Sequence, residues 1–160
     1  MIFVTLGSQK FQFNRLLKAL DEQIAEGKIR EEVFAQTGAS DYIPKHFSFV
    51  DYLDRGSFSE MTKKADIVIT HGGTGAIIGA LKKGKKVIAV PRLARYGEHV
   101  DDHQLQLLEQ FGELHLIRIC QDCGELWRAV EEVKKTEFER YQSNTPRFLE
   151  SIERYIEENT

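Results

Sequence analysis

The sequence predicts an α/β protein with an open, mostly parallel sheet of about six strands and helices on both faces. Two observations lead to this fold class. Short apolar runs rich in β-branched residues recur along the chain, as buried parallel strands do. Segments whose apolar residues have helical spacing lie between these runs. This alternation is typical of a parallel sheet covered by helices.

Six runs are predicted to be strands, at residues 2–6, 33–37, 47–50, 67–70, 87–90 and 114–119. Three helical faces follow the first, fourth and sixth runs, and their apolar residues are Phe13, Leu16, Leu17, Leu20 and Ile24, then Ala76, Ile77, Ala80 and Leu81, then Leu126, Val130 and Val133. A C-terminal helix is expected over about residues 144–158, with Pro146 in its first turn. No linker or repeat interrupts the chain, so residues 1–160 are expected to form a single domain.

The charge of the chain excludes some classes of partner. A formal net charge of −3 gives no overall basic footprint for nucleic acid. The lysine run at 82–86 is explained by cations near a helix C-terminus, and attraction to anionic lipid headgroups is the alternative. No run approaches the roughly 20 apolar residues of a membrane span, and no basic leader precedes the first strand. A cytoplasmic protein is therefore expected.

Two cysteines, Cys120 and Cys123, form one isolated CxxC pair. A tetrahedral zinc site needs a second pair of ligands, and the position does not suit a thioredoxin-type motif. Core or surface thiols in a reducing compartment are the expected interpretation.

The most informative segment is the motif HGGTG at 71–75, which joins an apolar strand to a helix-forming stretch. Glycine lacks a Cβ atom, so such a turn can adopt positive φ angles and bring backbone N–H groups close to a ligand. A helix that begins near Thr74 points its positive end at the same place, which favours a bound phosphate. The alternative is a tight connection that uses glycine only for close packing. No Lys-Ser/Thr pair follows, so ATP hydrolysis of the P-loop kind is not expected.

Polar residues and glycines follow four of the predicted strands, at 7–8, 36–38, 71–73 and 91–104. In open α/β sheets, ligands bind beyond the carboxyl ends of the strands where the topology reverses. The four loops are therefore expected to share one edge of the sheet and to form a single crevice.

The motifs HGGTG, GKKVIAVPR and EHVDDHQLQLLEQF, in this order, resemble the donor-binding half of GT-B glycosyltransferases, family 28 in particular. The opening IFVTLGSQKFQFNRLLKAL and the segment VFAQTGAS look like stand-alone subunits of bacterial exopolysaccharide and capsule synthesis. The chain is also similar to the small cytosolic subunit of the eukaryotic UDP-N-acetylglucosamine transferase pair. The resemblance runs to about Ile119 and implies one Rossmann-like GT-B lobe.

The resemblance implies a UDP-sugar donor whose diphosphate lies on the glycine turn and whose base packs near Val50. The expected donor-binding residues are Gly7, Ser8, Gln36, Gly38, Val50, His71, Gly72, Gly73, Thr74, Gly75, Asp102, His103 and Gln104. Some have structural alternatives. Asp102 suits a helix N-cap equally well, and His71 can simply cap the turn.

No metal cofactor is expected, because the chain has no DxD motif and the adjacent Asp101 and Asp102 make a poor paired clamp. The glutamate that grips the ribose in single-chain relatives falls on Gly79 here. Either the ribose is held elsewhere, with Glu98 a candidate, or the affinity for the donor is low. Glu98 and His99 are also the candidate catalytic residues, although the sequence does not identify the base.

The resemblance implies inverting transfer of a hexose to a polyprenyl-diphosphate-linked sugar in exopolysaccharide or capsule synthesis. A single lobe is expected to act only with a membrane-anchored companion subunit, which docks near residues 96–103 and holds the chain at the inner face of the membrane. Alone, the chain is expected to support self-association. The main alternative is a non-catalytic regulatory or scaffolding module that binds nucleotide sugar. A nucleotide-sugar epimerase is a weaker alternative, since it needs two lobes and more acidic residues near the sugar.

Overall fold

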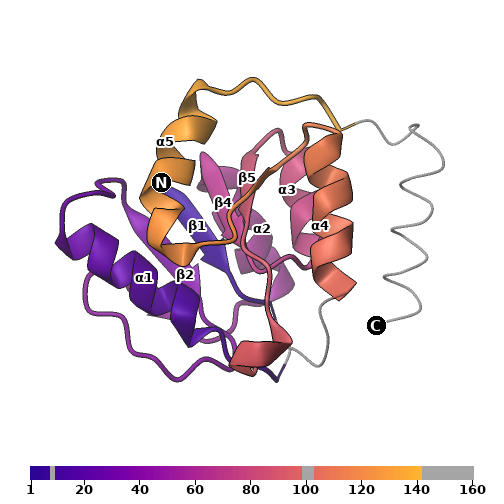
Figure 1. Ribbon diagram of the computed structural model, residues 1–160. Helices are drawn as coiled ribbons and strands as arrows, with labels where there is room; N and C mark the ends of the chain where they lie inside the picture. The colour runs from indigo at the N-terminus through magenta and orange to yellow at the C-terminus, as the bar shows by residue number, and fades with distance from the viewer. Residues whose placement is uncertain (8–9, 99–102, 142–160) are drawn as a thin grey trace.

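The structure of the protein is a computed structural model that describes residues 1–7, 10–98 and 103–141, and for residues 103 and 104 only the backbone. Within these residues the chain forms a six-stranded, fully parallel sheet in the order β3-β2-β1-β4-β5-β6 (Figure 1). The strands are β1 (Ile2–Thr5), β2 (Val33–Gln36), β3 (Ser48–Val50), β4 (Ile67–Thr70), β5 (Lys86–Ala89) and β6 (Arg118–Ile119). The predicted fold class is confirmed.

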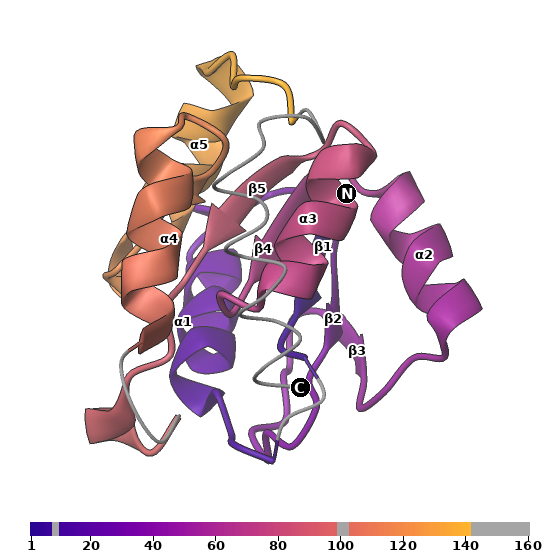
Figure 2. The same ribbon diagram turned by 90° about the vertical axis from the view of Figure 1, so that its right-hand side faces the viewer.

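Five helices cover the two faces of the sheet. Two of them pack on one face, α1 (Asn14–Ala25) and α5 (Leu126–Lys135). Three pack on the other, α2 (Arg55–Lys64), α3 (Thr74–Lys82) and α4 (His103–Glu113), as Figure 2 shows from the side. Two short 3-10 helices, η1 (Ala94–Tyr96) and η2 (Cys123–Glu125), lie in the loops after β5 and β6.

The central strand β1 divides the core into two layers. The side chains of Ile2 and Val4 enter the layer under α1 and α5, whereas Phe3 enters the layer under α2, α3 and α4. All four residues of β1 are buried. A strand that is apolar on both faces can exist only between helices, which is why its sequence shows no polar alternation.

The last strand is shorter than predicted. The prediction placed a strand at 114–119, but β6 contains only Arg118 and Ile119. The reason is the end of α4, where His115 adopts a left-handed φ of 56°. The N–H groups of His115 and Leu116 donate to the carbonyls of Gly112 and Phe111, at 3.0 and 3.2 Å. This Schellman cap occupies the residues that were predicted to begin the strand.

Two lysines of the 82–86 run bond to the carboxyl ends of neighbouring helices. Lys85 Nζ donates to the carbonyl of Lys63 at the end of α2, at 2.7 Å. Lys86 Nζ donates to the carbonyl of Lys134 at the end of α5, at 3.2 Å. Both cations therefore complement the negative ends of helices, as one of the two interpretations of this run predicted.

Both cysteines are buried free thiols. Burial raises the pKa of Cys120 to about 11 and that of Cys123 to about 12. Both groups are therefore neutral thiols near pH 7, which makes them poor nucleophiles. The interpretation of the CxxC pair as core thiols agrees with this environment.

The reversal of the topology falls between β1 and β4. The chain builds β1, β2 and β3 outward in one direction and then returns to place β4 on the other side of β1. The loops that leave the carboxyl ends of β1 and β4 therefore diverge and leave room between them. No helix within the described residues is long and apolar enough to cross a membrane. The C-terminal helix predicted at about 144–158 lies outside those residues.

Candidate functional site

A cavity of about 470 Å³ opens at the carboxyl edge of the sheet, at the point where the strand order reverses. Its lining comes from the last residues of β1 and β2, from the loops after β1, β3 and β4, and from the first turns of α2 and α3. The lining residues are Thr5, Gly7, Gln36, Leu53, Arg55, Phe58, His71, Gly73, Gly75 and Ala76. The lining contains one cation, Arg55, and no carboxylate among the described residues.

The glycine turn after β4 forms one wall of this cavity. Gly72 has a φ of 93°, a left-handed conformation that favours glycine. Gly73 then caps α3, which begins at Thr74. The N–H groups of Thr74, Gly75 and Ala76 have no carbonyl one turn earlier within the helix, so they can donate to a ligand. The first turn of α3 is thus suited to an anion.

The imidazole of His71 packs between two glycines. A Cβ atom added to Gly7 or to Gly73 would lie 2.6 Å from His71 Nε2 in either case. No side chain fits at either position, so both glycines are required for the close approach of the loops after β1 and β4. Gly38 packs in the same way, since a Cβ there would lie 2.8 Å from the carbonyl oxygen of Gly7.

A buried arginine, Arg92, fixes the imidazole of His71 through a hydrogen bond to its Nδ1. Arg92, from the loop after β5, donates from Nε to His71 Nδ1 at 3.1 Å. Its Nη2 donates to the carbonyl of Leu6 at 2.6 Å, and its Nη1 donates to the carbonyls of Phe11, Gln12 and Glu98. One guanidinium therefore joins the loops that leave β1, β4 and β5.

The predicted donor-binding residue Gln36 supports the Gly7 loop. Its Oε1 accepts from the Thr5 hydroxyl at 2.7 Å, and its Nε2 donates to the carbonyl of Gly7 at 3.1 Å. Val50 has a similar role, because its carbonyl accepts from both the N–H and the hydroxyl of Thr37. Gln36 still lines the cavity, whereas Val50, Gly38, Gly72 and Thr74 do not belong to its lining.

Glu98 does not occupy the position expected of a catalytic or ribose-binding group. Its residue is fully buried, and its carboxylate accepts from Arg15 and from the N–H of Leu93. A substrate cannot reach a carboxylate that is enclosed in this way. The burial and ion pairing of Glu98 therefore argue against its expected roles as a catalytic residue and as a ribose ligand. Its carboxylate instead stabilises the loop at 91–98.

Five predicted site residues cannot be placed in the cavity. Ser8, His99 and Asp102 lie outside the described residues, and His103 and Gln104 begin α4 with backbone alone described. Their expected roles stay predictions.

Sequence reasoning missed the residues that α2 brings to the cavity. Asp54 caps α2 by accepting from the N–H of Ser57 at 2.7 Å, and this cap places Arg55 in the first turn. Phe58 lies one turn later and is the apolar part of the same wall. Asp54 comes shortly after a predicted strand, and an aspartate there is a recognisable N-cap signal for a helix. The segment that follows has too few apolar residues to show helical periodicity.

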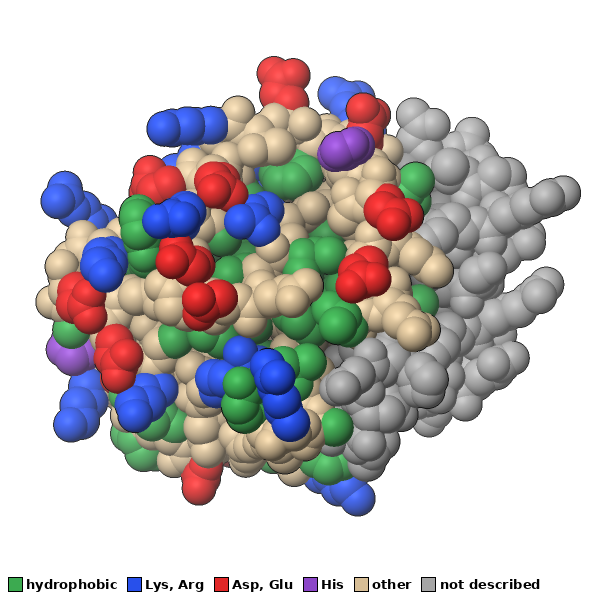
Figure 3. Space-filling view, viewed as in Figure 1, with side chains coloured by type: hydrophobic (Ala, Val, Ile, Leu, Met, Phe, Trp, Pro, Cys, Tyr) green, Lys and Arg blue, Asp and Glu red, His purple; other side chains and the backbone are tan. Residues whose placement is uncertain are grey.

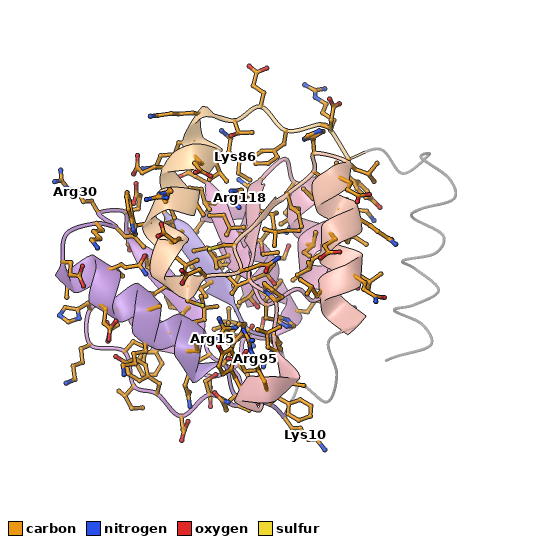
Figure 4. The ribbon with its side chains drawn as sticks, viewed as in Figure 1. Lys10, Arg15, Arg30, Lys86, Arg95 and Arg118 are labelled. Carbon is orange, nitrogen blue, oxygen red and sulfur yellow. The ribbon has the colours of Figure 1, made fainter. Side chains whose placement is uncertain are left out.

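The loop at 91–98 carries an exposed aromatic group, Tyr96. The ring of Tyr96 is stacked against the guanidinium groups of Arg15 and Arg95, each 4.8 Å from the ring centroid. Figure 4 labels these two arginines next to each other. At the same place Figure 3 shows Lys and Arg side chains beside hydrophobic ones, whereas acidic and basic groups are interspersed higher on this face.

The sequence of nearly the whole chain matches a known domain. Residues 1–158 match the glycosyltransferase family 28 C-terminal domain. The chain belongs to this family. Relatives of the chain include the human protein named UDP-N-acetylglucosamine transferase subunit ALG13, which is 30% identical over 118 residues. The Candida glabrata protein of the same name is 33% identical over 89 residues.

The chain aligns with less than half of the length of each of these relatives. The aligned part covers 68% of this chain and 10% of the human protein, and 54% of this chain and 43% of the Candida glabrata protein. The activity of those whole proteins is therefore a matter for proposal in this chain.

Solved structures share the fold. The glycosyltransferase of kitacinnamycin has a TM-score of 0.62 at 18% identity and covers 97% of this chain, which matches 38% of that chain. MurG of Acinetobacter baumannii has a TM-score of 0.57 at 15% identity over 83% of this chain and 41% of its own. A solution structure of ALG13 has a TM-score of 0.53 at 18% identity, over 97% of this chain and 94% of its own. The chain thus has the fold of one GT-B domain.

Proposed function

We propose that this family 28 domain is the donor-binding, catalytic subunit of a two-part glycosyltransferase that uses a UDP-sugar. The observation that carries the proposal is the cavity between β1 and β4. Backbone N–H groups of the first turn of α3 and the Arg55 side chain lie at its wall, and no carboxylate lines it among the described residues. These groups suit a diphosphate without a metal ion.

The choice of UDP is supported by the relatives. The human and Candida glabrata proteins are named as subunits of a UDP-N-acetylglucosamine transferase. A UDP-sugar places its diphosphate in the centre of the ligand, with the base on one side and the sugar on the other. Phe58 and Leu53 provide apolar surface near the cation, where a base can pack.

The word subunit in those names also supports a companion. We infer that the companion is anchored in the membrane, binds a polyprenyl-diphosphate-linked sugar and keeps this chain at the inner face. The transfer of a hexose then inverts the anomeric carbon during exopolysaccharide or capsule synthesis. Closing two lobes excludes water that would otherwise hydrolyse the donor. Tyr96, an exposed aromatic residue of the loop at 91–98 with 47% of its surface accessible, is the proposed centre of the docking surface.

Calorimetric titration with UDP tests the donor site. Arg55→Gln is expected to weaken UDP binding about five-fold, because it removes a charge-assisted hydrogen bond to phosphate. The matched control is Arg30→Gln, since Arg30 is another exposed arginine and precedes β2, at the amino edge of the sheet, opposite the carboxyl edge that holds the cavity. Equal affinities of the two variants would exclude Arg55 from the site, and no binding of UDP by the unaltered chain would reject the donor.

Reconstitution tests the two-part enzyme. The purified chain is supplied with a set of UDP-hexoses and a polyprenyl-diphosphate-linked sugar, with and without membranes that contain the companion. Transfer only in the presence of the companion is expected. Efficient transfer by the chain alone contradicts the two-part proposal. UDP binding without transfer under either condition favours the alternative, a regulatory or scaffolding module.

A further inference from the structure

Arg92 is the largest side chain in the fully buried core, with 1% of its surface exposed. Its hydrogen-bond acceptors are four backbone carbonyls and one imidazole nitrogen, His71 Nδ1. The face of the guanidinium also stacks on the ring of Phe13, with 5.1 Å between Arg92 Cζ and the ring centroid. Packing on all sides leaves this side chain a single orientation.

The contact between Arg92 and His71 determines which nitrogen of the imidazole carries a proton. Burial lowers the pKa of Arg92 to about 10, so the guanidinium is still charged near pH 7. A guanidinium has only donors, and therefore His71 Nδ1 must be the acceptor at 3.1 Å. A neutral imidazole that accepts at Nδ1 carries its hydrogen on Nε2. Protonation of both nitrogens would place a hydrogen on Nδ1 against the hydrogen of Arg92 Nε.

The other nitrogen of His71 lies between two glycines that line the cavity. Nε2 is the atom of His71 nearest to the added Cβ positions of Gly7 and Gly73, and His71, Gly7 and Gly73 all line the cavity. We propose that Arg92 is a positioning residue that locks His71 as the neutral Nε2–H tautomer, with this N–H directed at the phosphates of the donor. The fixed tautomer of His71 is a property of the free protein, whereas its role in donor binding rests on the proposed UDP-sugar site.

The charged groups around His71 come from three elements. Arg92 and Glu98 belong to the loop after β5, and the carboxylate of Glu98 is occupied by Arg15 of α1. Arg55 of α2 lines the same cavity. A fixed, uncharged donor needs no reorganisation when the diphosphate enters, which is the advantage of a preorganised site.

A lysine cannot replace Arg92 in this role. Its single ammonium group lacks the planar fork that reaches Leu6, Glu98 and His71 at once. Arg92→Lys is therefore expected to release His71 into a mixture of tautomers. Arg15→Lys is the matched control, because Arg15 is also a partly buried arginine, but its hydrogen bonds go to Glu98, Pro91 and Cys123.

Nitrogen NMR of the imidazole rings tests the lock directly. The five histidines are labelled with ¹⁵N, and the His71 ring is assigned through bonds from its own backbone. At pH 7 the unaltered chain is expected to show a pyrrole-type Nε2 and a pyridine-type Nδ1 for His71. An Nδ1–H tautomer or a doubly protonated ring would overturn the proposal, and neither result depends on UDP.

The variants then separate positioning from simple stabilisation. Arg92→Lys is expected to move both ¹⁵N shifts of His71 and to weaken UDP binding by about ten-fold, as loss of one hydrogen bond to a charged group does. Arg15→Lys is expected to leave both shifts in place. Unchanged His71 shifts in folded Arg92→Lys contradict the lock. Where that variant does not fold, the tautomer in the unaltered chain decides. Failure of UDP to bind a correctly locked chain rejects the donor site alone.

Discussion

Glu98 and Arg15 form a bidentate ion pair that ties α1 to the loop after β5. Arg15 Nε and Nη2 donate to the two carboxylate oxygens of Glu98, each at 3.0 Å. The side chain of Glu98 is 1% exposed and that of Arg15 is 24% exposed. The same carboxylate accepts from the N–H of Leu93 at 3.0 Å, so it closes its own loop as well.

Removing this carboxylate is expected to lower stability. Glu98→Ala leaves Arg15 without its partner and the Leu93 N–H without its acceptor, which should lower the free energy of unfolding by about 2–4 kcal/mol. Urea unfolding measures the change. Glu98→Gln keeps an acceptor for Leu93 and is expected to lose less. If Glu98→Gln instead abolishes transfer in the reconstituted enzyme with stability intact, Glu98 is catalytic and its assignment to loop support is wrong.

A methyl group at Gly73 is expected to disturb both the fold and the site. Gly73→Ala would bring Cβ to 2.6 Å from His71 Nε2 and 2.7 Å from its Cε1, so the imidazole must move. Overpacking of this kind costs about 1–3 kcal/mol. Thermal unfolding and UDP titration should both show a loss.

Gly79→Ala is the matched control for Gly73→Ala. Gly79 lies inside α3, and nothing lies within 4 Å of an added Cβ there. Alanine should stabilise this helix by up to about 1 kcal/mol. The two substitutions should therefore shift the melting temperature in opposite directions, and shifts of the same sign would contradict the packing of His71 on Gly73.

A glutamate at Gly79 is expected to tighten UDP binding. The open space around Gly79 admits the longer side chain, whose carboxylate can accept from the ribose hydroxyls as in single-chain relatives. One added hydrogen bond is worth about 1 kcal/mol, or roughly five-fold in affinity. Calorimetry of Gly79→Glu beside Gly79→Ala separates the new acceptor from the helix effect. Equal affinity of the two would show that this turn of α3 does not face the ribose.

Asp21 of α1 holds the segment before β3 through hydrogen bonds. Its carboxylate accepts from the hydroxyl of Tyr42 at 2.8 Å and from the N–H groups of Lys45 and His46 at 2.9 and 2.8 Å. Burial alone would raise the pKa of Asp21, but these donors outweigh burial and hold the pKa below its ordinary value. The deprotonated form is therefore the one that the fold stabilises.

This carboxylate should make stability depend on pH in the acid range. A pKa that is lower in the folded state gives stability above the unfolded value of about 4, and this stability disappears as the pH falls through the folded value. The difference in unfolding free energy between the unaltered chain and Asp21→Asn should accordingly be large at pH 7 and shrink towards pH 3. A difference that is independent of pH would show that packing, not charge, makes the contribution of Asp21.

The fold was readable from the sequence where local pattern and tertiary environment agree. The strand β4 occupies the predicted residues 67–70, since a short β-branched run has few uses other than a buried parallel strand. The helix α2 was missed because only Phe58 and Met61 mark its apolar face. Its helical state depends on packing against the sheet, which no local pattern contains.

The site was readable only in part, for a related reason. Glycines in strand-end loops indicate that two backbone segments approach closely. Gly7 and Gly73 do so, since both pack against the imidazole of His71. A polar side chain gives no such indication of its direction. Gln36 bonds to Thr5 and Gly7, and Arg92 bonds to residues as distant in sequence as Leu6. Contacts between distant segments follow from the finished fold and leave no trace in the spacing of residues.

The central place of β1 has a consequence for synthesis of the chain. The ribosome makes β1, β2 and β3 first, yet β1 finds its second neighbour only when β4 emerges. Until then β1 is an edge strand whose four residues all belong to the core, and Phe3 lacks the helices that cover it. Exposed apolar edges of this kind pair readily with other chains. A nascent chain stopped after β3 therefore depends on chaperone protection, which the later arrival of β4 and α3 makes unnecessary.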